Sequence, residues 1–158
     1  MLFRSNTTGI YLAYAGSAAT DLRISTGPST IFNVSAGWAF NTWLHVAAVR
    51  SSGTLTLYIN GTSRGSASFT NNCSDGLQYI GRPSDVANYM VQGYISNFRI
   101  VKGVAVYTSN FTPSTTPFTT TSQGVTAANV SLLTCQSYNF LDNSTNAIAA
   151  AVRNYISS

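Results

Sequence analysis

Hydrophobic and polar residues alternate strictly along the chain between Thr54 and Asn60. Leu55, Leu57 and Ile59 fall on one side of an extended backbone, and the residues between them carry hydroxyl groups. A period of two is typical of a β-strand with one buried face, and Leu, Ile, Thr and Tyr suit such a surface. The pattern therefore predicts a strand whose Leu55, Leu57 and Ile59 side chains face a core.

The segments on either side of this strand predict two hairpins. Before it, Trp43 to Arg50 is a second extended segment with apolar residues on both faces, followed by Ser51-Ser52-Gly53. A three-residue loop that ends in Gly fits a hairpin closed by a G1 bulge. After it comes Asn60-Gly61, whose residues tolerate the positive φ angles of a type I′ turn. We therefore predict a three-stranded antiparallel meander over Trp43 to Ala67.

Further short strand candidates lie along the chain, each bounded by turn residues. They are Gly9 to Tyr14, Leu22 to Ser25, Thr30 to Val34, Ser66 to Phe69, Leu77 to Ile80, Tyr94 to Val101, Val104 to Tyr107 and Val130 to Gln136. Many short strands separated by Gly, Asn and Ser indicate an all-β sandwich or barrel.

The Thr-rich segment from Thr108 to Asn129 contains two prolines, which cannot donate to a central ladder. We interpret it as a long extended connection anchored by Phe111 and Phe118, and a linker between two domains is the alternative. The 158 residues suit one domain over residues 1–158. The end of the chain, from Asn146, is rich in alanine; a short C-terminal helix and a strand both remain open there.

Charge is scarce, at 8% of residues, and it excludes some function classes. The sequence has no Glu, one lysine and seven arginines, with a net charge of +4. Nucleic-acid binders usually cluster their basic residues, whereas these arginines are dispersed, so we expect no nucleic-acid partner. No apolar run approaches the ~18 residues of a membrane span, and the N-terminus lacks the pattern of a signal peptide.

The two cysteines, Cys73 and Cys135, lie far apart in the sequence. A single disulfide is one alternative, if their strands are neighbours. Two buried free thiols are the other, and the sequence does not decide between them.

Several separate motifs resemble one known family. The run "WLHVAAVRSSGTLTLYINGT" resembles the core motif of laminin-G-like domains of the concanavalin A-like superfamily. The run "IGRPSDVANYMVQGYISNFRIVKGVAVYTSNFTPSTTPF" resembles the next segment of the versions found in bacteriophage, especially cyanophage, structural proteins. The run "LLTCQSYNFLDNST" is similar to their usual tail. The resemblance covers the chain from about Phe32 onward.

This resemblance implies a two-sheet antiparallel jelly-roll sandwich. It implies that Trp43 and Leu57 meet the opposite sheet. The connection from Phe111 to Phe118 would then cover the second face of Trp43 to Arg50. Family members usually begin with further strands, so the chain is a fragment, a split gene product or a domain completed by a neighbouring polypeptide. A sandwich without its first strands exposes a sheet edge. We therefore expect a homo-oligomer or a strand donated by another virion chain.

The function expected from this resemblance is a non-enzymatic structural module on a virion surface, in a tail fibre, baseplate or capsid. It would serve assembly, recognition of host-surface glycans, or both. A stand-alone lectin is the alternative, and its candidate carbohydrate-binding residues are Trp38, Asn88 and Tyr89, an aromatic and polar set on loops. Some family members bind Ca²⁺ through Asp and backbone oxygens, and Asp85 is the weak candidate here.

A glycoside hydrolase is the enzymatic alternative within the same superfamily. Glycoside hydrolysis usually needs two carboxylates about 5 to 9.5 Å apart. The four acids are all Asp and are widely separated, with Asp75 and Asp85 the closest pair in sequence. His45 lies within a predicted strand, where we expect local hydrogen bonding instead of catalysis. We therefore expect no enzymatic activity and no cofactor.

Overall fold

The structure is a computed structural model, and it describes most of the chain in separate ranges. These are residues 3–5, 10–15, 21–26, 29–35, 41–72, 78–81, 91, 93–137 and 141–148. The chain divides into two compact units. Unit 1 comprises Met1–Tyr94 and Tyr107–Pro113, and unit 2 comprises Ile95–Val106 and Ser114–Ser158. Each unit is described by itself below.

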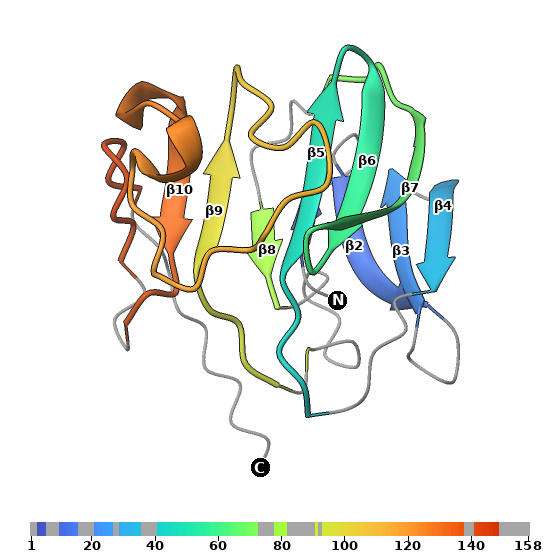
Figure 1. Cartoon of the computed structure of the whole chain (residues 1–158), viewed down its shortest axis with the longest axis horizontal. Helices are drawn as coiled ribbons and strands as arrows, with labels where there is room; N and C mark the ends of the chain where they lie inside the picture. Colours follow the sequence, from blue (N-terminus) through green and yellow to red (C-terminus); the bar gives the residue numbers. More distant parts are fainter. Residues whose placement is uncertain are drawn as a thin grey trace. The chain divides into compact units, whose positions relative to one another are not determined.

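The described residues form antiparallel β-structure and two short 3-10 helices, with no α-helix among them (Figure 1). The strands are β1 Phe3–Ser5, β2 Ile10–Ala15, β3 Asp21–Thr26, β4 Ser29–Ser35, β5 Val46–Ser51, β6 Thr54–Ile59, β7 Thr62–Ser68, β8 Gln78–Ile80, β9 Phe98–Val101 and β10 Val130–Thr134. The 3-10 helices are η2 Ser122–Gly124 and η3 Ala127–Asn129. Unit 1 holds a five-stranded sheet in the order β4-β3-β2-β1-β8 and a three-stranded sheet in the order β5-β6-β7, while unit 2 holds β9 and β10.

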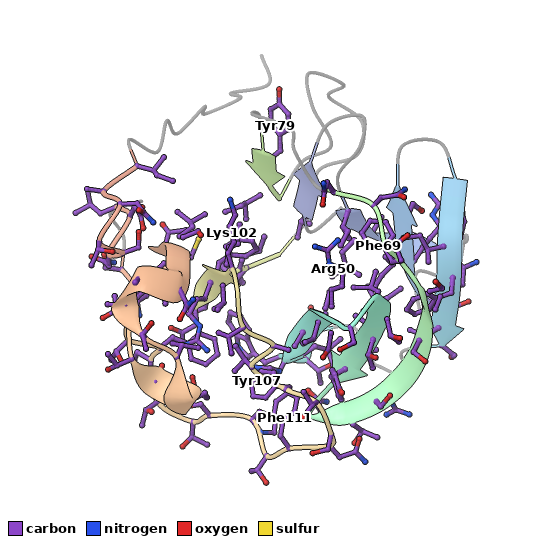
Figure 2. The ribbon with its side chains drawn as sticks, turned by 90° about the horizontal axis from the view of Figure 1, so that it is seen from above. Arg50, Phe69, Tyr79, Lys102, Tyr107 and Phe111 are labelled. Carbon is purple, nitrogen blue, oxygen red and sulfur yellow. The ribbon has the colours of Figure 1, made fainter. Side chains whose placement is uncertain are left out.

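The two sheets of unit 1 pack face to face around one apolar core, whose side chains fill the space between them in Figure 2. The buried members of this core are Leu12, Leu22, Ile24, Val34, Leu55, Leu57, Ile59 and Phe69. The predicted triplet on β6 is almost completely buried, with Leu57 at 0% exposure. The all-β sandwich predicted from the sequence is therefore confirmed, and so is the inner face of β6.

Both hairpins of the meander exist, but one differs from its prediction. Ser51 pairs with Thr54, so the β5–β6 loop has two residues, and Ser52 and Gly53 have φ angles of +47° and +77°. The predicted three-residue loop with a G1 bulge is wrong, because Ser52 itself takes the positive φ that a type I′ turn needs. The Asn60-Gly61 turn is confirmed, since both of its φ angles are positive.

Most predicted strands are present, and three differences are informative. The short strand β1 was not predicted. The expected strand over Tyr94 to Val101 is shorter, since β9 begins at Phe98. The expected strand over Val104 to Tyr107 is absent from this described stretch. The chain leaves β9 where the Lys102 N–H donates to the Asn129 carbonyl oxygen, 2.8 Å away.

Unit 2 has a smaller core of Val125, Val130 and Leu133, against which Val101, Val106 and Phe118 pack. Phe118, one end of the connection expected to cover the Trp43–Arg50 segment, packs against this core of unit 2. Its ring also lies 4.4 Å from the Arg99 guanidinium. An arginine of the same unit thus holds Phe118 within unit 2.

Some predictions concern residues outside the described ranges or remain untested. The C-terminal helix was expected from Asn146 onward, and the structure describes this part only to Ile148. The assignment of residues 1–158 to a single domain stays a prediction. Among the described residues, no helix has the length and apolar character that crossing a membrane requires.

Candidate functional site

The residues predicted to bind carbohydrate, Trp38, Asn88 and Tyr89, lie outside the described residues, as does the calcium candidate Asp85. These assignments therefore stay predictions. Within the described part of the chain, the aromatic side chain that is open to solvent near the meander is a different one, Trp43.

Trp43 is 69% exposed, so the expectation that it meets the opposite sheet is wrong. The reason is the alternation of side chains along an extended chain. Leu44 and Val46 pack against the core of unit 1. Alternation then directs Trp43 and His45 to the other side. The sequence shows apolar residues on both faces of this segment, and it does not show which face the opposite sheet covers.

His45, two residues after Trp43, is fixed by its backbone and by aromatic contacts. Its N–H donates to Asn60 Oδ1 at 3.0 Å, and its carbonyl oxygen accepts the Asn60 N–H at 2.8 Å. Its ring lies edge-on to Phe111, with 5.4 Å between ring centroids, and to Tyr107, at 6.2 Å. His45 lies just before β5, which begins at Val46, so its predicted place within a strand is wrong. Its backbone hydrogen bonds and ring contacts make it part of an aromatic cluster.

Phe111 is the centre of this cluster on the outer face of the three-stranded sheet. Its ring stacks on Tyr107, with 3.5 Å between centroids and a 6° interplanar angle. Figure 2 labels both residues, which lie near one another. It also contacts Tyr58 at 5.5 Å, which explains why Tyr58 is buried although it points away from the core. The expectation that Phe111 covers this second face is confirmed.

The segment that carries Phe111 is tied to the β6–β7 turn by two hydrogen bonds. The Phe111 N–H donates to the Gly61 carbonyl oxygen at 2.9 Å, and the Ser63 N–H donates to Asn110 Oδ1 at 2.9 Å. The backbone approaches so closely that a Cβ atom on Gly61 would lie 1.8 Å from the Phe111 oxygen. Gly61 is thus required by its φ of +77° and by this contact.

Exposed polar residues precede Trp43 directly in the chain. Asn41, with a φ of +60°, and Thr42 are both exposed. An exposed indole beside amide and hydroxyl groups can stack on the apolar face of a sugar ring and hydrogen-bond its hydroxyl groups. The sequence-based prediction did not include Trp43 among the candidate binding residues, because it placed Trp43 in the core.

Of the four acids, the structure describes Asp21 in unit 1 and Asp142 in unit 2. The Asp142 carboxylate accepts N–H groups from Leu133 at 3.0 Å, from Ser144 at 2.9 Å and from Ile148 at 2.9 Å. It also accepts the Ser144 hydroxyl at 2.8 Å. Partial burial raises the pKa of Asp142, but these hydrogen bonds together outweigh burial and lower it. Asp142 therefore organises its own loop.

Metal-binding and thiol chemistry find little support in the described residues. No group of three or more His, Cys, Asp or Glu side chains gathers among them. Cys135 is a half-buried free thiol. Burial raises the pKa of Cys135, so the reactive thiolate is disfavoured. Cys73 lies outside the described residues, and its pairing stays open.

Comparison with known proteins gives one match in sequence. The profile of the concanavalin A-like lectin/glucanases superfamily matches residues 1–106, a range that includes every strand of the two unit 1 sheets. No curated protein matches the chain.

Among solved structures, the chain is similar to residues 221–444 of an S-layer domain-containing protein from Clostridium thermocellum ATCC 27405, with 21% identity and a TM-score of 0.33. The match covers 69% of this chain and 62% of that one, so the chain spans less than two thirds of the solved structure. A likeness this distant carries no argument about function.

Proposed function

Because the chain belongs to the concanavalin A-like lectin/glucanases superfamily, we propose that it is a non-enzymatic carbohydrate-binding module with Trp43 as its aromatic platform. The observation that carries the proposal is the 69% exposure of Trp43, which lies in the segment that leads into β5. A large aromatic side chain left in solvent, beside polar residues, is a feature of binding surfaces more than of stable cores.

The packing around Trp43 supports a preorganised surface. The backbone of His45 forms two hydrogen bonds with Asn60, one to its side-chain Oδ1 and one from its N–H, and the His45 ring lies edge-on to the stacked pair of Tyr107 and Phe111. The chain on the C-terminal side of Trp43 is therefore fixed before a ligand arrives. A platform that is already ordered loses less conformational entropy on binding.

The distribution of carboxylates supports binding without catalysis. Glycosidases usually act through two carboxyl groups across one glycosidic bond, and this sequence has no Glu and four Asp. Both oxygens of Asp142 accept hydrogen bonds from their own loop. Incubation of the protein with β-glucans should release no reducing sugar. Turnover that disappears in Asp75→Asn or Asp85→Asn would contradict this expectation.

A glycan array followed by titration calorimetry tests the binding function. The wild-type protein should bind at least one saccharide class, and Trp43→Ala should lower that affinity by about tenfold or more. Trp43→Phe should retain part of it. Tyr94→Ala is the matched control, because Tyr94 is another aromatic residue in unit 1 and is 88% exposed. Equal losses in Trp43→Ala and Tyr94→Ala, or no binding by the wild type, would contradict the proposal.

The sequence resemblance to phage structural proteins supports a finer placement, on the surface of a virion as part of a tail fibre, baseplate or capsid. In that setting the module would contact other virion chains, as a homo-oligomer or through a donated strand, and would present its sugar-binding surface to a host. Mass spectrometry of purified particles tests the placement, and the mass of the isolated protein in solution tests self-association. A protein that is monomeric alone and absent from particles would contradict both statements.

A further inference from the structure

Strand β3 carries polar side chains on the face of its sheet that points away from the core. Leu22 and Ile24 are completely buried between the two sheets of unit 1. Because side chains alternate along a strand, Asp21, Arg23 and Ser25 point to the opposite face. β3 lies between β2 and β4, so this row runs along the middle of three strands (Figure 1).

Two atoms in this row are buried without hydrogen-bond partners. They are the Oγ of Ser25, a residue with 1% exposure, and the Nε of the half-buried Arg23. Asp21, two residues before Arg23, is the nearest acid along the strand, and no ion pair joins the two in the described part of the chain. An arginine in such a position departs from the dispersed surface arginines expected from the sequence.

The strands on either side of β3 place a small residue and a polar residue beside Arg23. On β2 the residue paired with Arg23 is the small, buried Ala13, and on β4 it is the exposed Asn33. Ser25 pairs with Tyr11 of β2 and with Thr30 of β4, and Thr30 is exposed. These side chains offer guanidinium, hydroxyl and amide donors on one face of the sheet.

We propose that these four residues, Arg23, Ser25, Thr30 and Asn33, form an oxyanion site, named here the β3 anion patch. A buried guanidinium N–H and a buried hydroxyl that lack partners both destabilise the fold until an acceptor reaches them. Sulfate, phosphate and carboxylate groups match the planar fork of arginine and carry the charge that complements it. A neutral hydroxyl group could satisfy Ser25 but would leave the charge of Arg23 unbalanced.

The β3 anion patch goes beyond the proposed function, because it lies on the five-stranded sheet and needs no sugar. Trp43 precedes a strand of the three-stranded sheet. The oxyanion could be a free ion or an acidic group on a polysaccharide. Both sources present the same chemistry to Arg23, and the experiment separates them.

Equilibrium dialysis of the full chain with radiolabelled inorganic sulfate tests the patch. The wild type should bind about one equivalent, and Arg23→Gln should weaken binding by about tenfold or more, because it removes a charge-assisted contact. Arg23→Lys should be intermediate, and Ser25→Ala should cause a smaller loss. Arg64→Gln is the matched control, since Arg64 is an exposed arginine on β7 and its loss should change little. No sulfate binding by the wild type, or equal losses in Arg23→Gln and Arg64→Gln, would overturn the proposal.

Competition identifies the source of the anion. Dextran sulfate and inorganic phosphate are compared by the concentration of anionic groups that displaces the bound sulfate. A far lower concentration for dextran sulfate would indicate an acidic polysaccharide, and equal concentrations would indicate a free ion. Displacement by neutral dextran would overturn the proposal. Trp43→Ala should leave sulfate binding unchanged. The anion patch and the carbohydrate platform can therefore fail separately.

If Arg23→Gln fails to fold, chemical modification of the wild-type protein tests the anion patch instead. Phenylglyoxal modifies accessible arginines, and mass spectrometry of peptides locates each modified residue. Sulfate should protect Arg23 from modification and leave Arg64 unprotected. Modification of Arg23 that is unaffected by sulfate would overturn the proposal.

Discussion

The two units of this chain are held together in different ways. In unit 1, alternating strands form two sheets that bury one apolar core, and hydrogen bonds run mainly along the ladders. The described residues of unit 2 form two strands and a smaller core, and polar side chains bond to much of the backbone between them. Ladders leave a repeating pattern in the sequence, whereas contacts between a side chain and a distant loop leave none.

Arg99 shows how a polar side chain holds a distant loop of unit 2 in place. Its guanidinium donates to the Ser122 carbonyl oxygen at 2.9 Å, to Ser122 Oγ at 3.0 Å, to Gln123 Oε1 at 3.1 Å and to the Thr119 carbonyl oxygen at 3.3 Å. It also lies over the Phe118 ring. One side chain on β9 thus orders a loop about twenty residues away in the sequence.

The most severe test of the comparison removes buried leucines. Leu57→Ala should reduce the free energy of unfolding by about 2 to 5 kcal/mol, because Leu57 is fully buried in the unit 1 core and alanine leaves a cavity. Leu133→Ala probes the unit 2 core, where Leu133 is 2% exposed. Its loss should be near the lower end of that range, because fewer apolar groups surround it. Urea denaturation measures both, and a larger loss for Leu133→Ala would reverse the comparison.

Two glycines with nearly the same φ separate backbone strain from close packing. Gly61 in unit 1 has a φ of +77° and Gly124 in unit 2 has +75°. A Cβ on Gly61 would collide with the Phe111 oxygen, whereas nothing lies within 4 Å of the Cβ position of Gly124. Gly124→Ala should therefore cost about 1 kcal/mol from its conformation alone, and Gly61→Ala about 1 to 3 kcal/mol more. Equal losses of thermal stability would show that the contact with Phe111 is unimportant.

Replacement of Arg99 tests the polar scaffold of unit 2. Arg99→Lys keeps the charge but removes the fork that reaches several acceptors, so stability should fall by about 1 to 3 kcal/mol. Arg64→Lys, at an exposed position of unit 1, should change stability little. Hydrogen exchange should show faster exchange in residues 118–124 for Arg99→Lys. Unchanged exchange there would mean that Arg99 does not order the loop.

The smallest expected effect is the dependence on pH that Asp142 confers. The hydrogen bonds to Asp142 lower its pKa in the folded state. The stabilisation is therefore fully present above the unfolded-state pKa of about 3.9 and is lost as the pH falls through the folded-state value. Asp142→Asn should flatten the stability curve in this acidic range, and Ser144→Ala, which removes one donor, should flatten it partly. A curve for Asp142→Asn that matches the wild type would contradict this role.

The sequence predictions were more successful in unit 1 than in unit 2. In unit 1 the inner face of β6, the Asn60-Gly61 turn and most strands were predicted, because alternation and positive-φ residues are local properties. In unit 2 the packing of Phe118 against Arg99 was not predicted, because it joins residues about twenty positions apart in the sequence. The candidate sugar site was predicted on loop residues outside the described ranges. The exposed Trp43 was placed in the core.

By itself, the sequence determined most of the strands, the turn at Asn60-Gly61 and the side of β6 that is apolar. Only the tertiary structure decided which of two apolar faces would be covered. Leu44 and Val46 packed against the core, Phe111 covered part of the other face, and Trp43 stayed in solvent. The physical reason is that backbone conformation depends on neighbouring residues, whereas the burial of a side chain depends on which distant segment packs against it. The unpartnered atoms of Arg23 and Ser25 depend in the same way on groups that the local sequence does not contain.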